Sequence, residues 1–471
     1  MQKKTNTMKE KNRRSLSKLV DQYEHQLETG EQIHLDEQSF LKLIDYYDEN
    51  GQIDKALFVV GQAIEKYLFS VDFYLRKAEL LLDLGDETEA LDVLEQANTF
   101  APGSIEINLL KAEALNYLDE RDAALQILND SKSNVPKSIL SEIFLMESLV
   151  YEHHADLDAM FDVLEQAVVN NPKNNEAVER LGLAMELTER YREGIKINEA
   201  IIDQHPYSHL AWYNLGNAYR ALDKTEEAID AYKYAIAIDE RFEYAYHACA
   251  AIYFLDEKHE QALEYFKDLL KIVHPSERGE IHLKIGSCYH LTNRNQLAKK
   301  HLLIAQKTSF YQDTVYFLLG SCALMDGTPK EAGYYFEKAV SINPDNGAYH
   351  ANLAKVRIQE EAYDEAVSHY KKAIDLHPDS TDIWADYILF YFDLGYEDKA
   401  FQLLDSATHY LGEVIAGYIR VALLYLAGKR NKGSILLWEL LMEDYEAHDV
   451  IFRIAPELEE DSEINAIIAV I

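Results

Sequence analysis

Residues 92–97 and residues 162–167 have the same sequence, DVLEQA, and a proline follows each copy five residues later, at Pro102 and Pro172. Identity over six residues, at the same distance from a proline, indicates an internal repeat. The two copies lie 70 residues apart. Because repeats that stack into solenoids are about 20–50 residues long, this distance predicts two repeats rather than one.

The segment around the first copy shows what one repeat contains. From Val71, apolar residues recur at helical spacing as far as a Gly-Asp turn at residues 85–86, and a second amphipathic stretch then ends at Phe100. This pattern predicts helix, turn and helix within 34 residues. Stepping along the chain predicts twelve repeats, with nine intervals of 34 residues and two of 36. The repeats begin at Glu37, Val71, Ile105, Ser141, Asn175, His209, Glu243, Gly279, Asp313, Gly347, Thr381 and Ile415.

Small residues recur at two positions of the repeat and predict how its two helices pack. Glycine or alanine dominates the eighth position, and alanine occupies the twentieth position in nine repeats. Small side chains at both places let the two helices approach closely. Proline occupies the thirty-second position in six repeats, where it ends the second helix. The alanines at the twentieth position are Ala56, Ala90, Ala124, Ala228, Ala262, Ala298, Ala332, Ala366 and Ala400.

This pattern resembles the tetratricopeptide repeat family, most fully in residues 209–242, which contain AWYNLGNAYRALDKTEEAIDAYKYAIAID. The resemblance covers residues 37–448 and implies an all-α fold, an α-solenoid wound as a right-handed superhelix with the first helix of each repeat on its concave face. We expect residues 19–36 to form an N-terminal capping helix and residues 449–471 a C-terminal capping segment. Residues 1–18, with seven basic residues and one acidic residue, predict a disordered tail.

The composition limits the classes of partner. The formal net charge is −36, from 82 acidic and 46 basic residues, which argues against binding to nucleic acid or to anionic membranes. It favours basic partners, or serves solubility alone. The N-terminus has no apolar secretory signal, and the apolar stretches at residues 415–428 and 435–442 are short or interrupted by charge. A cytoplasmic protein is expected.

The sequence shows no convincing catalytic or metal-binding constellation, and we therefore predict no enzyme activity, no cofactor and no metal. An alternative is a site made by His282, Cys288 and His290, which share one predicted helix. His282 and Cys288 occupy packing positions of their repeat, however, and are expected to be core residues. The histidines within residues 153–154 and 205–209 straddle turns without the spacing of metal ligands.

The resemblance places the concave face at positions two, five, nine, twelve and thirteen of the repeat. In the first repeats, leucine occupies position five and acidic residues occupy positions two and nine. Such a surface suits a basic, amphipathic segment, whose apolar side chains would be buried against the leucines while its cations meet the carboxylates. A solvated acidic face, with its leucines packed between repeats, is the alternative. The residues are Leu41, Leu75, Leu109, Leu145, Asp45, Asp72, Glu79, Glu106, Glu113, Glu142 and Glu176.

Tyr213, Asn214 and Asn217 extend the candidate groove and exclude one known binding mode. Family members that clamp chaperone C-termini use lysine at position five and asparagine at position nine. Asn217 matches the asparagine, but Tyr213 stands in place of the lysine, so chaperone-tail binding is rejected. Long arrays with a sugar-transferase domain use an asparagine ladder, for which only Asn214, Asn217 and Asn352 are candidates. We therefore predict a protein-interaction scaffold; the alternative is a self-assembling array that dimerises through its ends or its convex face.

Overall fold

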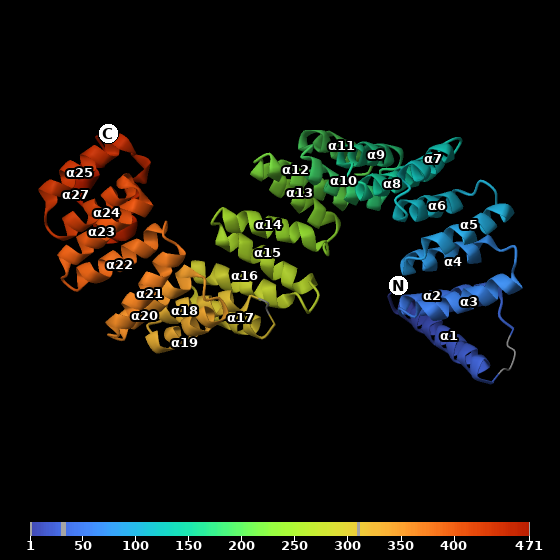
Figure 1. Ribbon diagram of the computed structural model, residues 1–471, viewed down its shortest axis with the longest axis horizontal. Coiled ribbons are helices and arrows are strands. Elements are labelled where there is room, and N and C mark those ends of the chain that lie inside the picture. Colours follow the sequence, from blue (N-terminus) through green and yellow to red (C-terminus); the bar gives the residue numbers. More distant parts are fainter. Residues whose placement is uncertain (1, 30–33, 309–310, 471) are drawn as a thin grey trace. The chain divides into compact units, whose positions relative to one another are not determined.

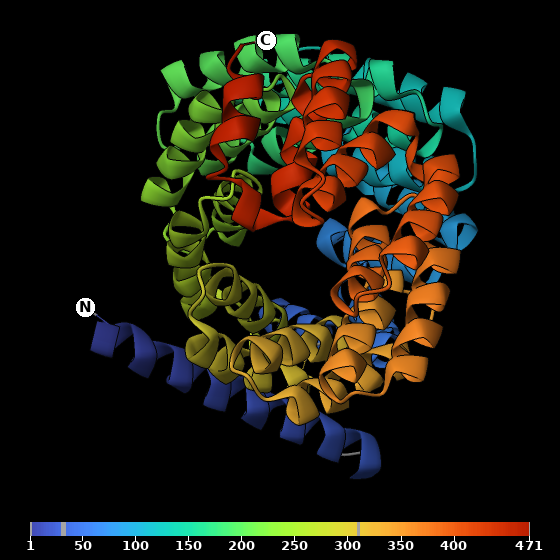
Figure 2. The ribbon, with the colours of Figure 1, turned by 90° about the vertical axis from the view of Figure 1, so that its left-hand side faces the viewer.

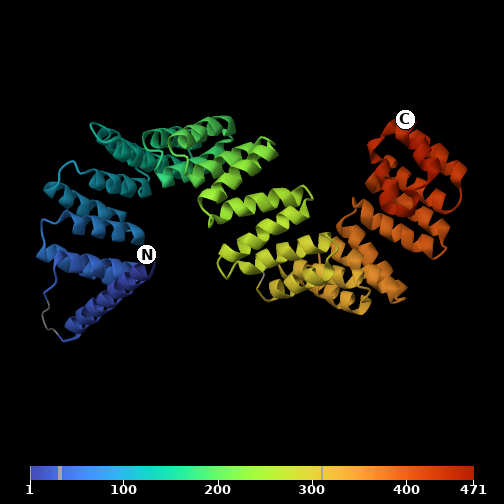
Figure 3. The ribbon, with the colours of Figure 1, turned by 180° about the vertical axis from the view of Figure 1, so that it is seen from behind.

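The computed structural model describes residues 2–29, 34–308 and 311–470, with side chains from residue 16 onward, and these residues form helices and no strand. The chain divides into two compact units, residues 1–245 and residues 246–471. Within each unit, helices that follow one another in the sequence pack side by side, as Figures 1 and 3 show. The predicted all-α solenoid is confirmed.

Each predicted repeat corresponds to one pair of helices, A and B. The A helices are α2 (Glu37–Glu49), α4 (Val71–Leu84), α6 (Ile105–Tyr117), α8 (Lys137–His153), α10 (Asn175–Thr188), α12 (His209–Ala221), α14 (Glu243–Leu255), α16 (Arg278–Leu291), α18 (Gln312–Met325), α20 (Gly347–Gln359), α22 (Thr381–Asp393) and α24 (Glu413–Leu426). The B helices are α3 (Ile53–Lys66), α5 (Glu87–Phe100), α7 (Arg121–Ser131), α9 (Leu157–Asn170), α11 (Tyr191–Gln204), α13 (Thr225–Ile238), α15 (His259–Ile272), α17 (Asn295–Thr308), α19 (Pro329–Ile342), α21 (Tyr363–Leu376), α23 (Glu397–Leu411) and α25 (Arg430–Glu443).

The two 36-residue intervals are absorbed locally. The first lengthens a helix, because α8 begins at Lys137, four residues before the predicted start of its repeat, and has 17 residues. The second lengthens the connection between α15, which ends at Ile272, and α16, which begins at Arg278. None of the described helices has both the length and the apolar character needed to cross a membrane; α24 and α25 have 14 residues each.

Close approach of helices A and B organises each repeat, as the small residues predict. Every alanine at the twentieth position is completely buried. In the sixth repeat, the ring of Tyr232 on α13 is also fully buried and lies directly over Gly216 on α12. A Cβ atom at Gly216 would stand 2.5 Å from Cε1 of Tyr232, well inside van der Waals contact. The ring therefore fills the space that a side chain at residue 216 would need.

The N-terminal helix begins earlier than the predicted capping helix of residues 19–36 and ends at Thr29; residues 30–33 lie outside the described part of the chain. Helix α1 (Gln2–Thr29) is one uninterrupted helix, seen at the N-terminal end of the chain in Figure 2, and it includes most of the segment assigned above to a disordered tail. Residues 2–29 contain neither proline nor glycine, so nothing in the local sequence stops the helix. Val20 and Tyr23 are buried against the first repeat, and the Tyr23 hydroxyl donates to Gln62 Oε1 at 2.7 Å.

At the C-terminus, short helices follow α25: η1 (Glu446–His448), α26 (Asp449–Ile454), η2 (Pro456–Leu458) and α27 (Ser462–Ile468). Their apolar side chains join the core that α22 to α25 build, and so cover the apolar face of the last repeat. The buried members are Val450, Ile451, Ile454, Leu458 and Ile464.

Replacing Gly216 by alanine should destabilise the first unit, because the new methyl group must displace the buried Tyr232 ring. We expect a loss of about 1–3 kcal/mol, the usual effect of overpacking. Gly61→Ala is the matched control, because Gly61 also lies within a helix and a Cβ atom there would meet nothing within 4 Å. That control should leave the protein as stable or raise its stability by up to about 1 kcal/mol. Thermal melting followed by circular dichroism measures both; equal melting curves would contradict the packing role of Gly216.

Candidate protein-binding surface

The A helices of the first unit stack on one another, so equivalent repeat positions come to lie side by side. Helix α4 contacts α6, α6 contacts α8, α8 contacts α10, and α10 contacts α12. Ion pairs between neighbouring A helices show the alignment directly. Arg76 Nη2 on α4 lies 3.0 Å from Asp45 Oδ1 and 3.1 Å from Asp48 Oδ2, both on α2. Side chains at positions two, five and nine can therefore form continuous rows.

The four leucines at position five are half-buried. Each packs in part against the hydrophobic core of the solenoid, and the rest of its side chain remains accessible. Part of the alternative interpretation is therefore correct, since the leucines do contribute to packing between helices. They are Leu41, Leu75, Leu109 and Leu145.

The carboxylates beside these leucines are more accessible. Glu79 and Glu113 are half-buried, and the other five are exposed. We call the surface made by the four leucines and these seven carboxylates the acidic face. The exposed carboxylates are Asp45, Asp72, Glu106, Glu142 and Glu176.

Negative charge accumulates on the acidic face between α4 and α6. Burial raises the pKa of the Glu113 carboxyl, and the neighbouring carboxylates of Asp83 and Glu79 raise it further, while a hydrogen bond with Tyr117 acts in the opposite direction. Like charges that share a site disfavour each other's ionisation. A cation placed near Glu113 would relieve this repulsion.

Two arginines of the chain neutralise part of the acidic face. Arg76 Nη1 binds Glu79 Oε2 at 2.6 Å, in addition to its contacts with α2. Arg180 Nη1 lies 2.8 Å from Glu152 Oε2, and its Nε lies 3.5 Å from Glu176 Oε1. Within the described residues, four carboxylates of the acidic face form no ion pair: Asp72, Glu106, Glu113 and Glu142.

Tyr213, Asn214 and Asn217 lie inside the packing rather than on an accessible groove. Asn214 is buried and its Nδ2 donates to the backbone carbonyl of Val178 at 2.7 Å. Asn217 is also buried; its Nδ2 donates to Glu186 Oε1 at 2.9 Å and its Oδ1 accepts from the Tyr232 hydroxyl at 2.7 Å. The half-buried ring of Tyr213 packs against Tyr232 and other aromatic rings. These three residues hold neighbouring repeats together.

A cavity of about 520 Å³ lies between α11, α12 and α13 and was not predicted from the sequence. Its wall includes the rings of Trp212 and Tyr234, which stack with centroids 4.4 Å apart, and the ring of Tyr219. Aromatic faces and carboxylates together attract ammonium or guanidinium groups, so the cavity can accept a lysine or arginine side chain. Its aromatic and acidic residues are visible in the sequence, but aromatic residues at these positions also pack between helices, so they did not predict a cavity. The carboxylates around the cavity are Glu199, Asp203, Glu227 and Asp230.

His282, Cys288 and His290 do not converge on one site. The Nδ1 atoms of His282 and His301 lie 2.9 Å apart, whereas Nδ1 of His290 lies 3.4 Å from Sγ of Cys322. Cys288 is completely buried, and burial raises the pKa of its thiol to about 11. A protonated, buried thiol is neither a nucleophile nor a ready metal ligand. Cys288 belongs to the hydrophobic core, as predicted, whereas His282 and His290 are half-buried.

Among curated proteins, the human protein O-mannosyl-transferase TMTC1 is 23% identical over 182 residues. The alignment includes 37% of this chain and spans only about a fifth of the relative, 20% of its length.

Solved structures that are similar to this chain include the APC/C hetero-tetramer Cut9–Hcn1, which is 14% identical with a TM-score of 0.38 and aligns with 82% of this chain and 96% of that chain. YrrB, described as a TPR protein with an unusual peptide-binding site, is 20% identical with a TM-score of 0.34 over 40% of this chain and 95% of that chain. PilF of Pseudomonas aeruginosa is 22% identical with a TM-score of 0.36 over 44% of this chain and 93% of that chain.

Family models of the tetratricopeptide repeat match four parts of the chain, residues 41–105, 209–242, 313–346 and 357–413. One of them coincides with residues 209–242, the repeat in which the sequence pattern is most complete. The matches fall in both units and agree with the period of the helix pairs. The chain belongs to the tetratricopeptide repeat family.

Proposed function

We propose that this protein is a non-catalytic scaffold that binds a basic, amphipathic segment of another protein on the acidic face. Interaction with other proteins is the general role that the tetratricopeptide repeat fold suggests. The finer proposal rests on one observation: exposed carboxylates lie in rows beside half-buried leucines along four successive A helices. Neither feature alone would distinguish a binding surface from a solvated one.

The leucines supply the apolar part of the interaction. Each still exposes part of its side chain, and covering about 40 Å² of one leucine would contribute roughly 1 kcal/mol at about 25 cal/mol per Å². Because consecutive A helices place the leucines in a row, a partner with apolar residues on one side could contact several of them together. The row thus favours an extended or helical segment over a single side chain.

The carboxylates supply selectivity and speed of association. Asp72, Glu106 and Glu142 form no ion pair within the described residues, and repulsion from Glu79 and Asp83 contributes to the raised pKa of Glu113. Lysine or arginine side chains of a partner would occupy this negative field. Complementary charge mainly raises the association rate and rejects partners of the wrong sign.

The proposal assigns no reaction to the chain. The acidic face contains carboxylates and leucines but no paired nucleophile and base, and the Cys288 thiol is buried and protonated. The transferase activity in the name of the human relative belongs to a protein of which this chain matches 20%. We therefore do not transfer that activity.

Reversing two charges on the acidic face should abolish partner binding. In the double variant Glu106→Lys, Glu142→Lys, two exposed carboxylates become cations that repel a basic segment while the leucines remain. Affinity capture from native lysate, followed by identification of the captured proteins, compares this variant with the wild type. We expect the wild-type protein to capture a partner with a basic segment and the variant to lose it.

The matched control is Asp92→Lys, Asp130→Lys, which alters the net charge equally but lies on the B helices α5 and α7. Both control residues are exposed, so all the variants should melt as the wild type does, and a melting curve checks this. Loss of the partner from both double variants would show that total charge, rather than the acidic face, determines binding. Retention by both would exclude the acidic face as the site.

Salt should slow association with a basic peptide more than it accelerates dissociation. A synthetic leucine–lysine peptide of about five helical turns, roughly 18 residues, is the probe, and a leucine–glutamate peptide of the same length is its control. Between about 0.05 M and 0.5 M salt, the screening length falls several-fold, and we expect the association rate constant to fall about tenfold or more. Surface plasmon resonance measures both rate constants; an association rate that is independent of salt would contradict electrostatic steering.

A further inference from the structure

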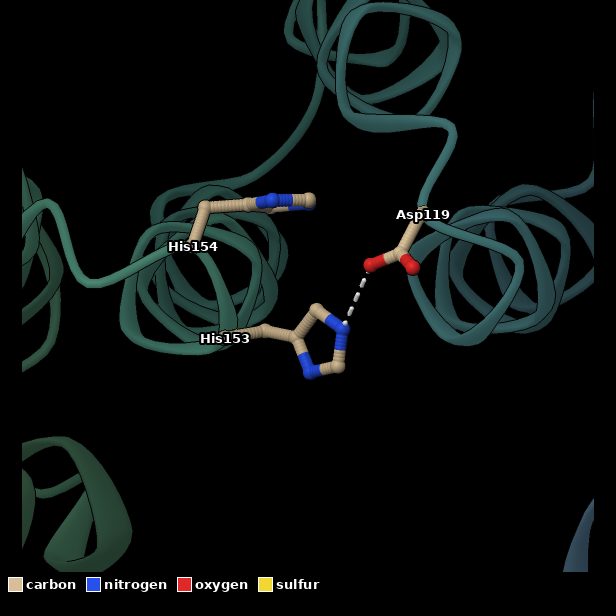
Figure 4. A group of neighbouring side chains, drawn as sticks. All are labelled: Asp119, His153 and His154. Atoms are coloured by element: carbon tan, nitrogen blue, oxygen red, sulfur yellow. Dashed lines mark hydrogen bonds and ion pairs between the residues drawn. The ribbon is translucent and has the colours of Figure 1, made fainter.

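Three side chains of metal-binding type meet where the third and fourth repeats pack. Asp119 lies in the turn after α6, and His153 and His154 lie at the end of α8. One ligand atom from each of the three residues lies within 4.8 Å of the other two. Figure 4 shows both imidazole rings extending from the end of α8 toward Asp119. The sequence predicted no metal site here, because the two histidines straddle a turn without the spacing of metal ligands; Asp119 lies 34 residues before His153.

The backbone holds these side chains in place. Asp119 has a left-handed conformation with φ of 60°, which aspartate tolerates better than most residues. Its amide N–H donates to the carbonyl of Asn116 at 3.1 Å and so closes the end of α6. His154 caps α8, and its N–H donates to the carbonyls at the end of that helix. Because A helices of adjacent repeats contact each other, the turn after α6 lies beside the end of α8.

The distance between two of the ligand atoms suits a metal ion. Asp119 Oδ1 lies 3.1 Å from His153 Nε2. In a tetrahedral zinc site with bonds of about 2.0–2.1 Å, ligand atoms are separated by about 3.3 Å. An ion can therefore bridge this pair with little movement. The His154 nitrogen must come closer, which rotation about its side-chain bonds can achieve.

His154 provides an independent indication. Its Nε2 atom is buried and has no hydrogen-bond partner within the described residues. Buried side-chain nitrogens are normally paired, so an isolated one requires an explanation. Asp156, the next carboxylate along the chain, does not supply a partner: its Oδ2 binds Arg121 Nη2 at 2.6 Å, and its Oδ1 accepts from the Ala159 N–H at the start of α9.

The set of Asp119, His153 and His154 occurs between the third and fourth repeats and not at the equivalent positions of other neighbouring repeats in the first unit. At the preceding junction, the corresponding residues are Gly85 with Tyr117 and Leu118, which offer no set of metal ligands. At a later one, Glu189 corresponds to Asp119, but the pair that follows is Ala221 and Leu222. The three-ligand set is therefore not a by-product of the repeat pattern.

We propose that Asp119, His153 and His154 bind one transition-metal ion of the zinc type. Two imidazoles and one carboxylate form a ligand set that Zn²⁺ accepts, whereas Mg²⁺ prefers oxygen ligands alone. Three protein ligands leave one coordination position to water. The bound ion links the turn of the third repeat to α8 of the fourth and strengthens that junction of the solenoid.

The test is Zn²⁺ binding to the full chain, measured by calorimetry and by equilibrium dialysis with metal analysis. Asp119→Asn, His153→Ala and His154→Ala each remove one ligand. We expect each variant to bind one Zn²⁺ fewer per chain, or to bind it at least about 100-fold more weakly, since even residues behind the ligands change affinity 10–100-fold. Zn²⁺ should raise the melting temperature of the wild type, and EDTA should reverse the effect.

The matched control is His448→Ala, because His448 Nε2 lies 3.4 Å from Asp449 Oδ1 in a pair that has no third ligand within the described residues. This variant should bind Zn²⁺ as the wild type does. Asp119→Asn preserves side-chain shape and tolerates the left-handed conformation, so folding should survive, as circular dichroism will show. Co²⁺ can replace Zn²⁺ in the wild-type chain, and its visible absorption spectrum shows whether protein side chains coordinate the ion. Equal zinc stoichiometry and affinity in the wild type and the three variants would overturn the proposal, as would a cobalt spectrum of the hydrated ion.

Discussion

The close contact between helices A and B within each repeat is the constraint on which the rest of this structure depends. In the sixth repeat, the buried ring of Tyr232 occupies the space above Gly216, and Ala228 is completely buried at the same helix pair. Interiors packed at the density of organic crystals leave no room for an added methyl group at such a place. The small residues therefore determine the separation of the two helices, and each repeat presents the same shape to its neighbour.

That uniformity is why the period predicted so much of the fold. Ten of the twelve A helices begin within one residue of the predicted repeat starts, and α8 and α24 begin four and two residues early. The small residues and the prolines recur because every repeat meets the same packing requirement. One sequence therefore shows the same packing requirement of helices A and B in twelve repeats.

The candidate site was less predictable, because polarity alone does not reveal where a side chain lies. Asn214 reads as a surface residue, yet it packs over Gly182 and donates to the carbonyl of Val178. The missing Cβ atom of Gly182 provides the space, and that relation joins residues in adjacent repeats. Helix α1 shows the opposite difficulty: residues 2–15 carry little apolar signal, but their local helix propensity continues the helix that Val20 and Tyr23 anchor.

The residues that pack the two helices and the residues that carry the acidic side chains occupy different positions of the repeat. The acidic face can therefore be confined to some repeats while the packing of the two helices continues in the others. Position two is Asp72, Glu106, Glu142 and Glu176 in repeats two to five, but Leu210 in the sixth repeat and Tyr244 in the seventh. Position eight remains small across the same boundary, with Gly182, Gly216 and Ala250. The row of carboxylates therefore stops while the packing continues. A row that ends within the first unit agrees with the proposed binding of a partner segment of limited length.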